Sequence, residues 1–404
     1  MKKICVIGLG YIGLPTASIL AKHGFKIVGV DVKKDLAKKL KQGQIGTSEP
    51  GLEIQVKTVI KSGNLHPKTE LEPADVFIIC VPTPLTDDHK ADLSYVKDAT
   101  ESILPYLRKN NLVILESTVP PGTTREILAS ILETNGLEAG KDFYLAHCPE
   151  RVLPGRILKE LVENDRIIGG INLRSAQAAK EIYQTFVTGE IYLTDSVTAE
   201  MTKLVENSFR DVNIAFANEL SRICDQLDID VWEIIGLANK HPRVNILSPG
   251  PGVGGHCTAV DPWFIVQKAP QETKLIKTSR MINESMPDCV VEKVEKAIKQ
   301  AGIKEPIIAC LGITYKADVD DLRESPALKI VGKLKDKGYS LRVCDPYVKD
   351  CIGLDLFRLQ EAINGADCVV LLVNHKNFKK LNPAQLLKEM RGNIIIDTRG
   401  AWPS

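Results

Sequence analysis

One cysteine lies in a stretch of sequence whose composition excludes a helix interior. Between Ser248 and Asp261 the chain places four glycines and two prolines ahead of Cys257, and both residue types disfavour helix. Glycines let backbone amides approach a bound ligand, and a thiol on such a loop can act as a nucleophile once it ionises. The alternative is an ordinary glycine-rich turn with an incidental cysteine. The stretch favours a catalytic thiol at Cys257.

The other cysteines carry no metal-binding or disulfide pattern. The ten cysteines of the chain are scattered, and no Cys-x-x-Cys pair occurs, which excludes zinc-ribbon and thioredoxin-like motifs. His256 has no further ligand at metal-binding spacing, so we expect it to form a hydrogen bond in the loop, and no metal site is predicted. Five cysteines lie in or beside apolar, strand-like runs, where a reduced cysteine acts as a small hydrophobic residue: Cys5, Cys80, Cys310, Cys344 and Cys368.

A glycine fingerprint opens the chain. The segment Gly8-Leu9-Gly10-Tyr11-Ile12-Gly13 is a G-x-G-x-x-G pattern between a predicted strand and a predicted helix, and Asp31 follows 23 residues after the first glycine. Such glycines allow a tight turn and close approach to a pyrophosphate at the helix N-terminus. Asp31 would bind a ribose 2′-OH and repel a 2′-phosphate, which favours NAD over NADP, although Lys33 and Lys34 stand nearby. A turn without a ligand is the alternative.

A third group shares one face of a predicted helix. From Thr198 apolar residues recur with a period near 3.6, and Lys203, Asn207 and Arg210 stand at i, i+4 and i+7 beside that stripe. A solvated polar face is the ordinary explanation. A lysine and an amide near a thiol are also the groups expected where a developing oxyanion is stabilised. Ser196 or Thr198 is the predicted cap of this helix.

Two α/β domains around a helical middle must position these groups. Strand-like runs separated by helix-length segments are typical of Rossmann-like, doubly wound parallel sheets, and we predict one in each α/β domain. In the second, only Gly312 matches the three glycines of the first turn, so no second dinucleotide fingerprint is expected. The predicted domains are 1–195, 196–295 and 296–404. The predicted strands are Ile4–Ile7, Lys26–Val30, Val76–Val81, Leu112–Leu115, Phe143–His147, Ile307–Leu311, Leu341–Cys344, Cys368–Val373 and Asn393–Ile396, and predicted helices cover Leu14–His23 and Ala327–Lys337.

Composition places the chain among ordinary globular proteins. Its 404 residues include 52 Lys and Arg against 51 Asp and Glu, which disfavours a general nucleic-acid or membrane-surface binder. Its longest apolar runs are far shorter than the roughly 20 residues of a membrane span. The N-terminus lacks a secretory pattern, so we expect a cytoplasmic protein.

Seven motifs in order give the chain a resemblance to a known family. Together they resemble the nucleotide-sugar 6-dehydrogenases, the UDP-glucose/GDP-mannose dehydrogenase family, over essentially the whole length. The resemblance implies two successive NAD-linked oxidations at C6 of the sugar through a covalent cysteine adduct, followed by hydrolysis of a thioester. The motifs are Gly8–Gly13, Val81–Pro84, Glu116–Gly122, Cys148–Gly155, Ala199–Asn207, Gly254–Cys257 and Thr314–Pro326.

The resemblance also implies residue roles. Cys257 would capture the C6 aldehyde, and Glu150 or Asp261 would be the general base of hydrolysis. Around the reacting oxygen and a water it implies Lys203, Asn207, Asp261 and Thr118. For NAD it implies Gly8, Gly10, Tyr11, Ile12, Gly13, Asp31, Lys34, Pro82, Thr83, Thr118 and Arg323. For the nucleotide sugar it implies Arg151, Val152, Leu153, Lys203, Asn207, Arg210, His241, Arg243, Gly252, Gly254, Gly255 and Lys316.

The choice of sugar rests on smaller differences. Glucose- and mannose-type members resemble one another in a P-E-F-L-R-E-G motif, whereas this chain has Arg151-Val152-Leu153-Pro154 after its Pro-Glu, and His256 stands where they tend to have serine. This favours a 2-acetamido sugar, and the segments Arg210–Leu220 and His241–Gly250 favour UDP-N-acetyl-D-mannosamine as substrate. UDP-N-acetylglucosamine and UDP-glucose stay as alternatives.

Two alternative functions must be weighed against the one that the family resemblance implies, and the resemblance also bears on assembly. A single-step β-hydroxyacid dehydrogenase would need the lysine and asparagine but no thiol and no third domain. A non-catalytic NAD- or nucleotide-sugar-binding regulator would need no acid, base and nucleophile set. Because the family pairs its long central helices between subunits, the resemblance also implies a homodimer.

Overall fold

The computed structural model describes residues 2–45 and 49–402. The chain divides into two compact units. Unit 1 comprises Met1–Glu206 with Trp263–Pro270, and unit 2 comprises Asn207–Pro262 with Gln271–Ser404. The three-domain division with boundaries at 195 and 295 stays a prediction.

Unit 1 is built on one large sheet, whose strand order within the described residues is β3-β2-β1-β4-β5-β6-β7-β8. The first six strands in this order are parallel, which confirms the predicted doubly wound sheet. The last two strands depart from the prediction, because β7 runs antiparallel to β6 and β8 follows β7. The strands are β1 Lys3–Ile7, β2 Lys26–Val30, β3 Leu65–Lys68, β4 Val76–Ile79, β5 Leu112–Leu115, β6 Tyr144–His147, β7 Arg166–Gly170 and β8 Ile191–Asp195.

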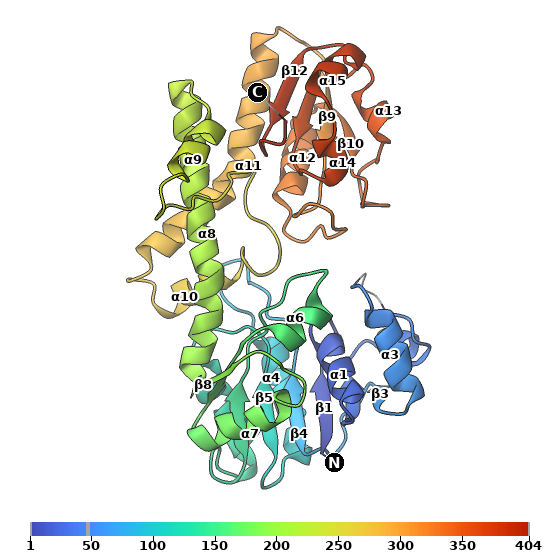
Figure 1. Cartoon of the computed structure of the whole chain (residues 1–404), viewed down its shortest axis with the longest axis vertical. Coiled ribbons are helices and arrows are strands. Elements are labelled where there is room, and N and C mark those ends of the chain that lie inside the picture. Colours follow the sequence, from blue (N-terminus) through green and yellow to red (C-terminus); the bar gives the residue numbers. More distant parts are fainter. Residues whose placement is uncertain (1, 46–48, 403–404) are drawn as a thin grey trace. The chain divides into compact units, whose positions relative to one another are not determined.

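Helices cover both faces of this sheet (Figure 1). One buried cluster packs one face against α1, α3, α6 and α7, and a second packs the opposite face against α4 and α5. Strands buried on both faces explain the continuous apolar runs in the sequence. The helices of unit 1 are α1 Gly13–Lys22, α2 Lys34–Lys41, α3 Leu52–Lys61, α4 Ser94–Glu101, α5 Ala129–Leu132, α6 Ile157–Glu163 and α7 Leu173–Tyr183, with α10 Asp261–Lys268 largely in the same unit.

Unit 2 repeats this architecture on a smaller scale. Its described sheet has the order β10-β9-β11-β12, all parallel. This order matches β2-β1-β4-β5 of unit 1, as the predicted second α/β domain requires. The strands are β9 Ile307–Leu311, β10 Ser340–Cys344, β11 Cys368–Leu371 and β12 Ile394–Asp397. The helices are α9 Val231–Ala238, α11 Lys274–Gln300, α12 Pro326–Asp336, α13 Leu359–Ile363, α14 Lys376–Lys379 and α15 Pro383–Glu389.

The long helix α8 spans Ser196–Leu227. Its predicted cap was wrong: the Asp195 carboxylate accepts hydrogen bonds from the backbone N–H groups of Val197 and Thr198, at 3.0 and 3.2 Å. An acidic side chain there satisfies helix donors that have no partner within the helix. Among the helices that the structure describes, none is both long and apolar enough to span a bilayer.

A buried polar network joins α8 to α11 within unit 2. Asp211 of α8 pairs with the fully buried Arg280 of α11 at 2.6 Å. Asn283 of α11 donates to the Asp211 carboxylate and accepts from Asn218 of α8, at 2.8 Å each. Asn218 in turn accepts the backbone N–H of Gly250 at 2.8 Å. The base of the glycine-rich loop is thereby fixed to both helices.

Candidate active site

The turn after β1 has the geometry that a bound dinucleotide requires. Gly8 has a φ of 92°, in the left-handed region. A Cβ at Gly13 would lie 1.8 Å from the Gly8 carbonyl oxygen, so only glycine lets α1 begin this close to the strand. A Cβ at Gly10, by contrast, would meet no atom within 4 Å. The Gly10 backbone therefore faces open space, where a pyrophosphate can approach it, and the turn fits NAD.

The remaining predicted cofactor residues of unit 1 follow the ends of neighbouring strands. Asp31 follows β2 and is half-buried, and its carboxylate accepts the backbone N–H groups of Leu9 and Lys33 at 3.0 and 2.9 Å. Thr83, after β4, donates its hydroxyl to the Thr118 carbonyl, after β5, at 2.5 Å. Parallel strands end at one edge, which is where such sheets bind ligands. The segments that follow these strands at this edge contain Tyr11, Ile12, Asp31, Lys34, Pro82, Thr83 and Thr118.

Glu150 is held by two donors in a nearly closed environment. It is 9% exposed and lies three residues after β6. One carboxylate oxygen accepts the backbone N–H of Arg151 at 2.7 Å, and the other pairs with the buried Arg166 at 3.0 Å. Arg166 can reach it because β7 is antiparallel, which brings the first residue of β7 to the carboxyl end of β6. Sequence analysis missed Arg166, since nothing local marks an arginine that begins an apolar strand.

A second buried acid lies in the same region of unit 1. Glu116 follows β5 and accepts the Tyr183 hydroxyl at 2.6 Å, the Thr16 hydroxyl at 3.2 Å and the Cys80 thiol at 3.1 Å. Burial raises the pKa of Glu116 above its ordinary value. The Arg166 guanidinium stacks over the Tyr183 ring, 4.7 Å from its centre. This buried cluster thereby links the segments that follow β4 and β5 to helices α1 and α7.

The other predicted side chains of unit 1 are placed less closely. Arg151 pairs with Glu206 of α8, its Nε donating to the carboxylate at 3.0 Å. Its guanidinium is thus held by the protein itself. Val152 is half-buried, Leu153 is 43% exposed, and Lys203 is half-buried on α8.

In unit 2 the cysteine loop ends at a helix. Residues 248–260 form no helix, as predicted, and α10 starts at Asp261. The Cys257 carbonyl accepts the backbone N–H groups of Val260 and Asp261, at 2.9 and 2.8 Å, so the half-buried Cys257 stands one turn before α10. The structure also joins two predicted site residues, because the Asn207 amide donates to the Asp261 carboxylate at 2.5 Å. The Asn207 amide is thereby oriented by a buried acid close in sequence to the thiol.

At these glycines of the loop, other parts of the protein lie too close for a side chain to fit. A Cβ at Gly255 would lie 2.9 Å from the Tyr315 ring, and one at Gly254 would lie 2.6 Å from the Glu324 carbonyl oxygen. Gly252 has a φ of 128°. The loop thus packs against Tyr315. Sequence analysis did not predict this contact. Burial raises the pKa of the Tyr315 hydroxyl, and Asp321 adds to that effect.

The remaining predicted residues of unit 2 are exposed. Arg323 forms a double hydrogen bond with Asp321, at 3.0 and 2.6 Å, which raises the pKa of its guanidinium. Arg323 belongs to unit 2, whereas the other predicted cofactor residues belong to unit 1. Exposed side chains also belong to Arg210, His241, Arg243 and Lys316.

The buried cysteines are poorly suited to act as nucleophiles. A thiol acts as a nucleophile only as its thiolate, which burial in apolar surroundings disfavours. Cys80, where burial raises the pKa well above its ordinary value, lies beside Glu116. Burial raises the thiol pKa to about 12 at Cys5, Cys148, Cys310, Cys344 and Cys368. For four of these, and for Cys80, this agrees with the structural role predicted from the sequence.

Three matches to family profiles cover nearly the whole chain. The UDP-glucose/GDP-mannose dehydrogenase family matches by its NAD binding domain over residues 2–187, its central domain over 197–285 and its UDP binding domain over 309–404. The chain belongs to the UDP-glucose/GDP-mannose dehydrogenase family. It is accordingly an NAD-dependent nucleotide-sugar dehydrogenase, with an NAD-type cofactor and a nucleotide-sugar substrate.

The chain is also similar to individual members of this family over nearly its whole length. The chain is 55% identical over 404 residues to a UDP-N-acetyl-D-mannosamine dehydrogenase of Methanocaldococcus jannaschii, covering 98% of this chain and 92% of that protein. It is 48% identical over 413 residues to an NDP-N-acetyl-D-galactosaminuronic acid dehydrogenase of Ralstonia solanacearum, covering 99% and 96%. The solved structure of a UDP-D-ManNAc dehydrogenase from Pyrococcus horikoshii matches with a TM-score of 0.93 at 45% identity, covering 99% and 96%.

Proposed function

We propose that this enzyme oxidises UDP-N-acetyl-D-mannosamine at C6 to UDP-N-acetyl-D-mannosaminuronate, in two steps and with NAD in preference to NADP. The observation that carries the chemistry is the arrangement in unit 2, where the half-buried Cys257 precedes α10 and the Asn207 amide is bound to Asp261. The sugar assignment is supported by the relative of that name at 55% identity. The half-buried Asp31 carboxylate, which follows β2, supports NAD.

The first oxidation needs charge stabilisation and the second needs a nucleophile. NAD, when bound, accepts the hydride removed from C6 in each oxidation. Lys203 and Asn207 would stabilise negative charge on the reacting oxygen, a contribution of a few kcal/mol for each well-placed donor. The Cys257 sulfur adds to the C6 aldehyde and forms a thiohemiacetal, so the aldehyde is not released. Loss of the second hydride leaves a thioester on Cys257.

Hydrolysis of the thioester is assigned to Glu150. Water adds to the thioester carbonyl while a carboxylate takes its proton, the carbon–sulfur bond breaks, and the uronate leaves with the thiolate restored. Glu150 suits this role because the Arg151 N–H and Arg166 orient both of its oxygens. Thr118 and Asp261 would hold the attacking water.

The assembly is proposed as a homodimer through α8. Large apolar side chains are exposed along this helix, with Phe209 at 70%, Phe216 at 54% and Leu227 at 62%. A stripe of this kind is typical of a surface that another copy covers. Sedimentation of the full chain at micromolar concentration should give twice the monomer mass, and a monomeric mass would contradict the dimer.

Initial rates on three substrates test the proposed function. The purified chain should reduce NAD fastest with UDP-N-acetyl-D-mannosamine, with little activity on UDP-N-acetylglucosamine or UDP-glucose. Cys257→Ala should form no uronate, whereas the matched Cys289→Ala, at a half-buried cysteine of α11, should behave as wild type. Preference for another sugar would overturn the substrate assignment alone. Uronate formation by Cys257→Ala would overturn the covalent route.

A further inference from the structure

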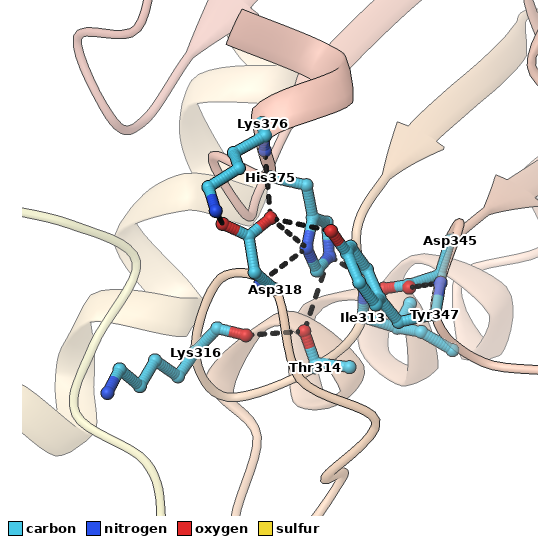
Figure 2. Close-up of polar contacts among 8 residues, drawn as sticks. All are labelled: Ile313, Thr314, Lys316, Asp318, Asp345, Tyr347, His375 and Lys376. Atoms are coloured by element: carbon cyan, nitrogen blue, oxygen red, sulfur yellow. Dashed lines mark hydrogen bonds and ion pairs between the residues drawn. The ribbon is translucent and has the colours of Figure 1, made fainter. Parts of the chain in front are cut away.

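A buried histidine connects three strand ends of unit 2. His375 is fully buried and lies beyond the carboxyl end of β11, while the loop after β9 and Asp345 after β10 reach it from either side. Figure 2 shows the imidazole at the centre of these contacts. Its ring also stacks on Tyr347, with the centres 4.9 Å apart.

The contacts of His375 define which nitrogen carries the proton. The backbone N–H of Asp318 donates to Nδ1 at 2.9 Å, so Nδ1 is the acceptor. Nε2 therefore carries the hydrogen and donates it to the Asp345 carboxylate at 3.1 Å, with the Thr314 hydroxyl at 3.3 Å. A neutral imidazole thus joins a backbone donor on one side to a buried carboxylate on the other.

The loop after β9 is fixed at both ends through this histidine. Asp318 has a φ of 62°, a conformation that is uncommon for residues other than glycine. Its carboxylate accepts the Tyr347 hydroxyl and the Lys376 backbone N–H, at 3.0 Å each. At the other end the Thr314 hydroxyl donates to the Lys316 carbonyl at 2.8 Å. The loop is thereby held in one conformation.

Lys316 lies between the two fixed ends of the loop, and its side chain is not part of the cluster around His375. Its carbonyl is bound to Thr314, but its side chain is exposed and leads away from the cluster (Figure 2). The loop follows a strand at the carboxyl edge of the sheet, the ligand side of such folds, and it belongs to the segment that matches the UDP binding domain. A side chain on a loop that is already ordered loses less freedom when it binds a ligand.

We infer that His375 is a positioning residue for the nucleotide sugar: it fixes the Thr314–Asp318 loop so that Lys316 is presented to the nucleotide. The inference rests on the proposed binding of a UDP-sugar by this segment. His375 itself is buried beneath the loop and contacts no ligand in this account. Its loss should weaken nucleotide binding without altering the chemical step.

The test measures UDP binding to the full chain by calorimetry, together with KM and kcat for each substrate. His375→Asn retains an acceptor near the Nδ1 position and should keep UDP affinity within a few-fold of wild type. His375→Gln places its amide nearer the Nε2 position and should lose about tenfold or more. KM for the nucleotide sugar should rise in parallel, while kcat and KM for NAD stay near wild type. The exposed His66→Gln on β3 of unit 1 is the matched control.

Each outcome decides between distinct possibilities. If wild type binds UDP and both His375 variants bind it equally well, the positioning role is wrong. Equal loss of NAD and UDP affinity would show general damage and would also overturn it. If a His375 variant fails to fold, Tyr347→Phe removes one contact to Asp318 while keeping the ring, and it must weaken UDP binding measurably. Failure of wild type itself to bind UDP would overturn the proposed function and, with it, this inference.

Discussion

The first strand of each of the two units is followed by the same kind of turn. The glycine after the first strand has a φ of 92° at Gly8 and 90° at Gly312. Its N–H donates to the last carbonyl of the neighbouring strand at 2.8 Å in both, at Val30 and Cys344. The backbone geometry that precedes a dinucleotide site is therefore present twice in one chain.

The acid that closes this turn is used differently in the two units. Asp31 accepts the N–H of Leu9 at 3.0 Å, and Asp345 accepts the N–H of Ile313 at 2.8 Å. Asp31 is half-buried, so its carboxylate stays partly accessible. Asp345 is 8% exposed, and the oxygen that accepts the Ile313 N–H also accepts a hydrogen bond from His375 of the protein itself. The same local structure binds an internal side chain in unit 2, whereas in unit 1 we propose that it binds the cofactor.

The helix that follows differs as well. In unit 1 α1 starts at Gly13, directly after the turn, and its N-terminus faces the ligand side. In unit 2 α12 starts only at Pro326, with Ser325 as its cap. The intervening segment carries Lys316. Under the proposed function, side chains of this longer loop would bind the nucleotide sugar, whereas backbone amides would bind the pyrophosphate in unit 1.

The largest expected effect comes from removing the acid of unit 2. Asp345→Ala leaves the N–H groups of Ile313 and Tyr347 and the His375 Nε2–H without their acceptor, and each buried orphan costs roughly 1–3 kcal/mol. Urea unfolding should show a loss of about 3 kcal/mol or more. Asp31→Ala, where water can reach the freed groups, should lose under about 1 kcal/mol. Equal losses would contradict the difference drawn between the two acids.

A smaller effect is expected at the turn of unit 1. Gly10→Ala adds a Cβ where the protein has no atom within 4 Å, so stability should not fall. The methyl group should obstruct the pyrophosphate and weaken NAD binding roughly tenfold, or about 1.4 kcal/mol. Gly332→Ala on α12, where a Cβ also meets nothing within 4 Å, is the matched control and should leave NAD binding unchanged. Calorimetric titration with NAD would refute the expectation if both variants bound it alike.

The smallest expected effect concerns cofactor choice. Asp31→Ala removes a negative charge that would face a 2′-phosphate, so the ratio of kcat/KM for NAD over NADP should fall roughly fivefold, or about 1 kcal/mol. Asp345→Asn, which changes the corresponding acid of unit 2, is the control and should leave the ratio unchanged. An unaltered ratio in Asp31→Ala would mean that another group selects the cofactor.

The sequence predicted the parts of the fold that local patterns encode. Glycine spacing identified the first turn, and apolar runs located each predicted strand within one or two residues, although the parallel strand β3 was missed. Strand direction is not a local property, so the antiparallel β7 and β8 were not foreseen. Nor was α11 predicted, since Pro287 within it ordinarily interrupts a helix.

The candidate site divides in the same way. Helical periodicity placed Lys203, Asn207 and Arg210 on one helix, but the Asn207–Asp261 contact joins residues 54 positions apart. Arg166 and His375 act through contacts made only in the folded chain, and no spacing rule reveals them. Their discovery required the structure.

Under the proposed function, one chain carries out a four-electron oxidation of a nucleotide sugar. The most direct test is to convert a limiting amount of UDP-N-acetyl-D-mannosamine completely and count the NADH formed. Complete conversion should give two NADH for each sugar consumed, with the uronate as product. One NADH per sugar, with an aldehyde released, would contradict the proposed function.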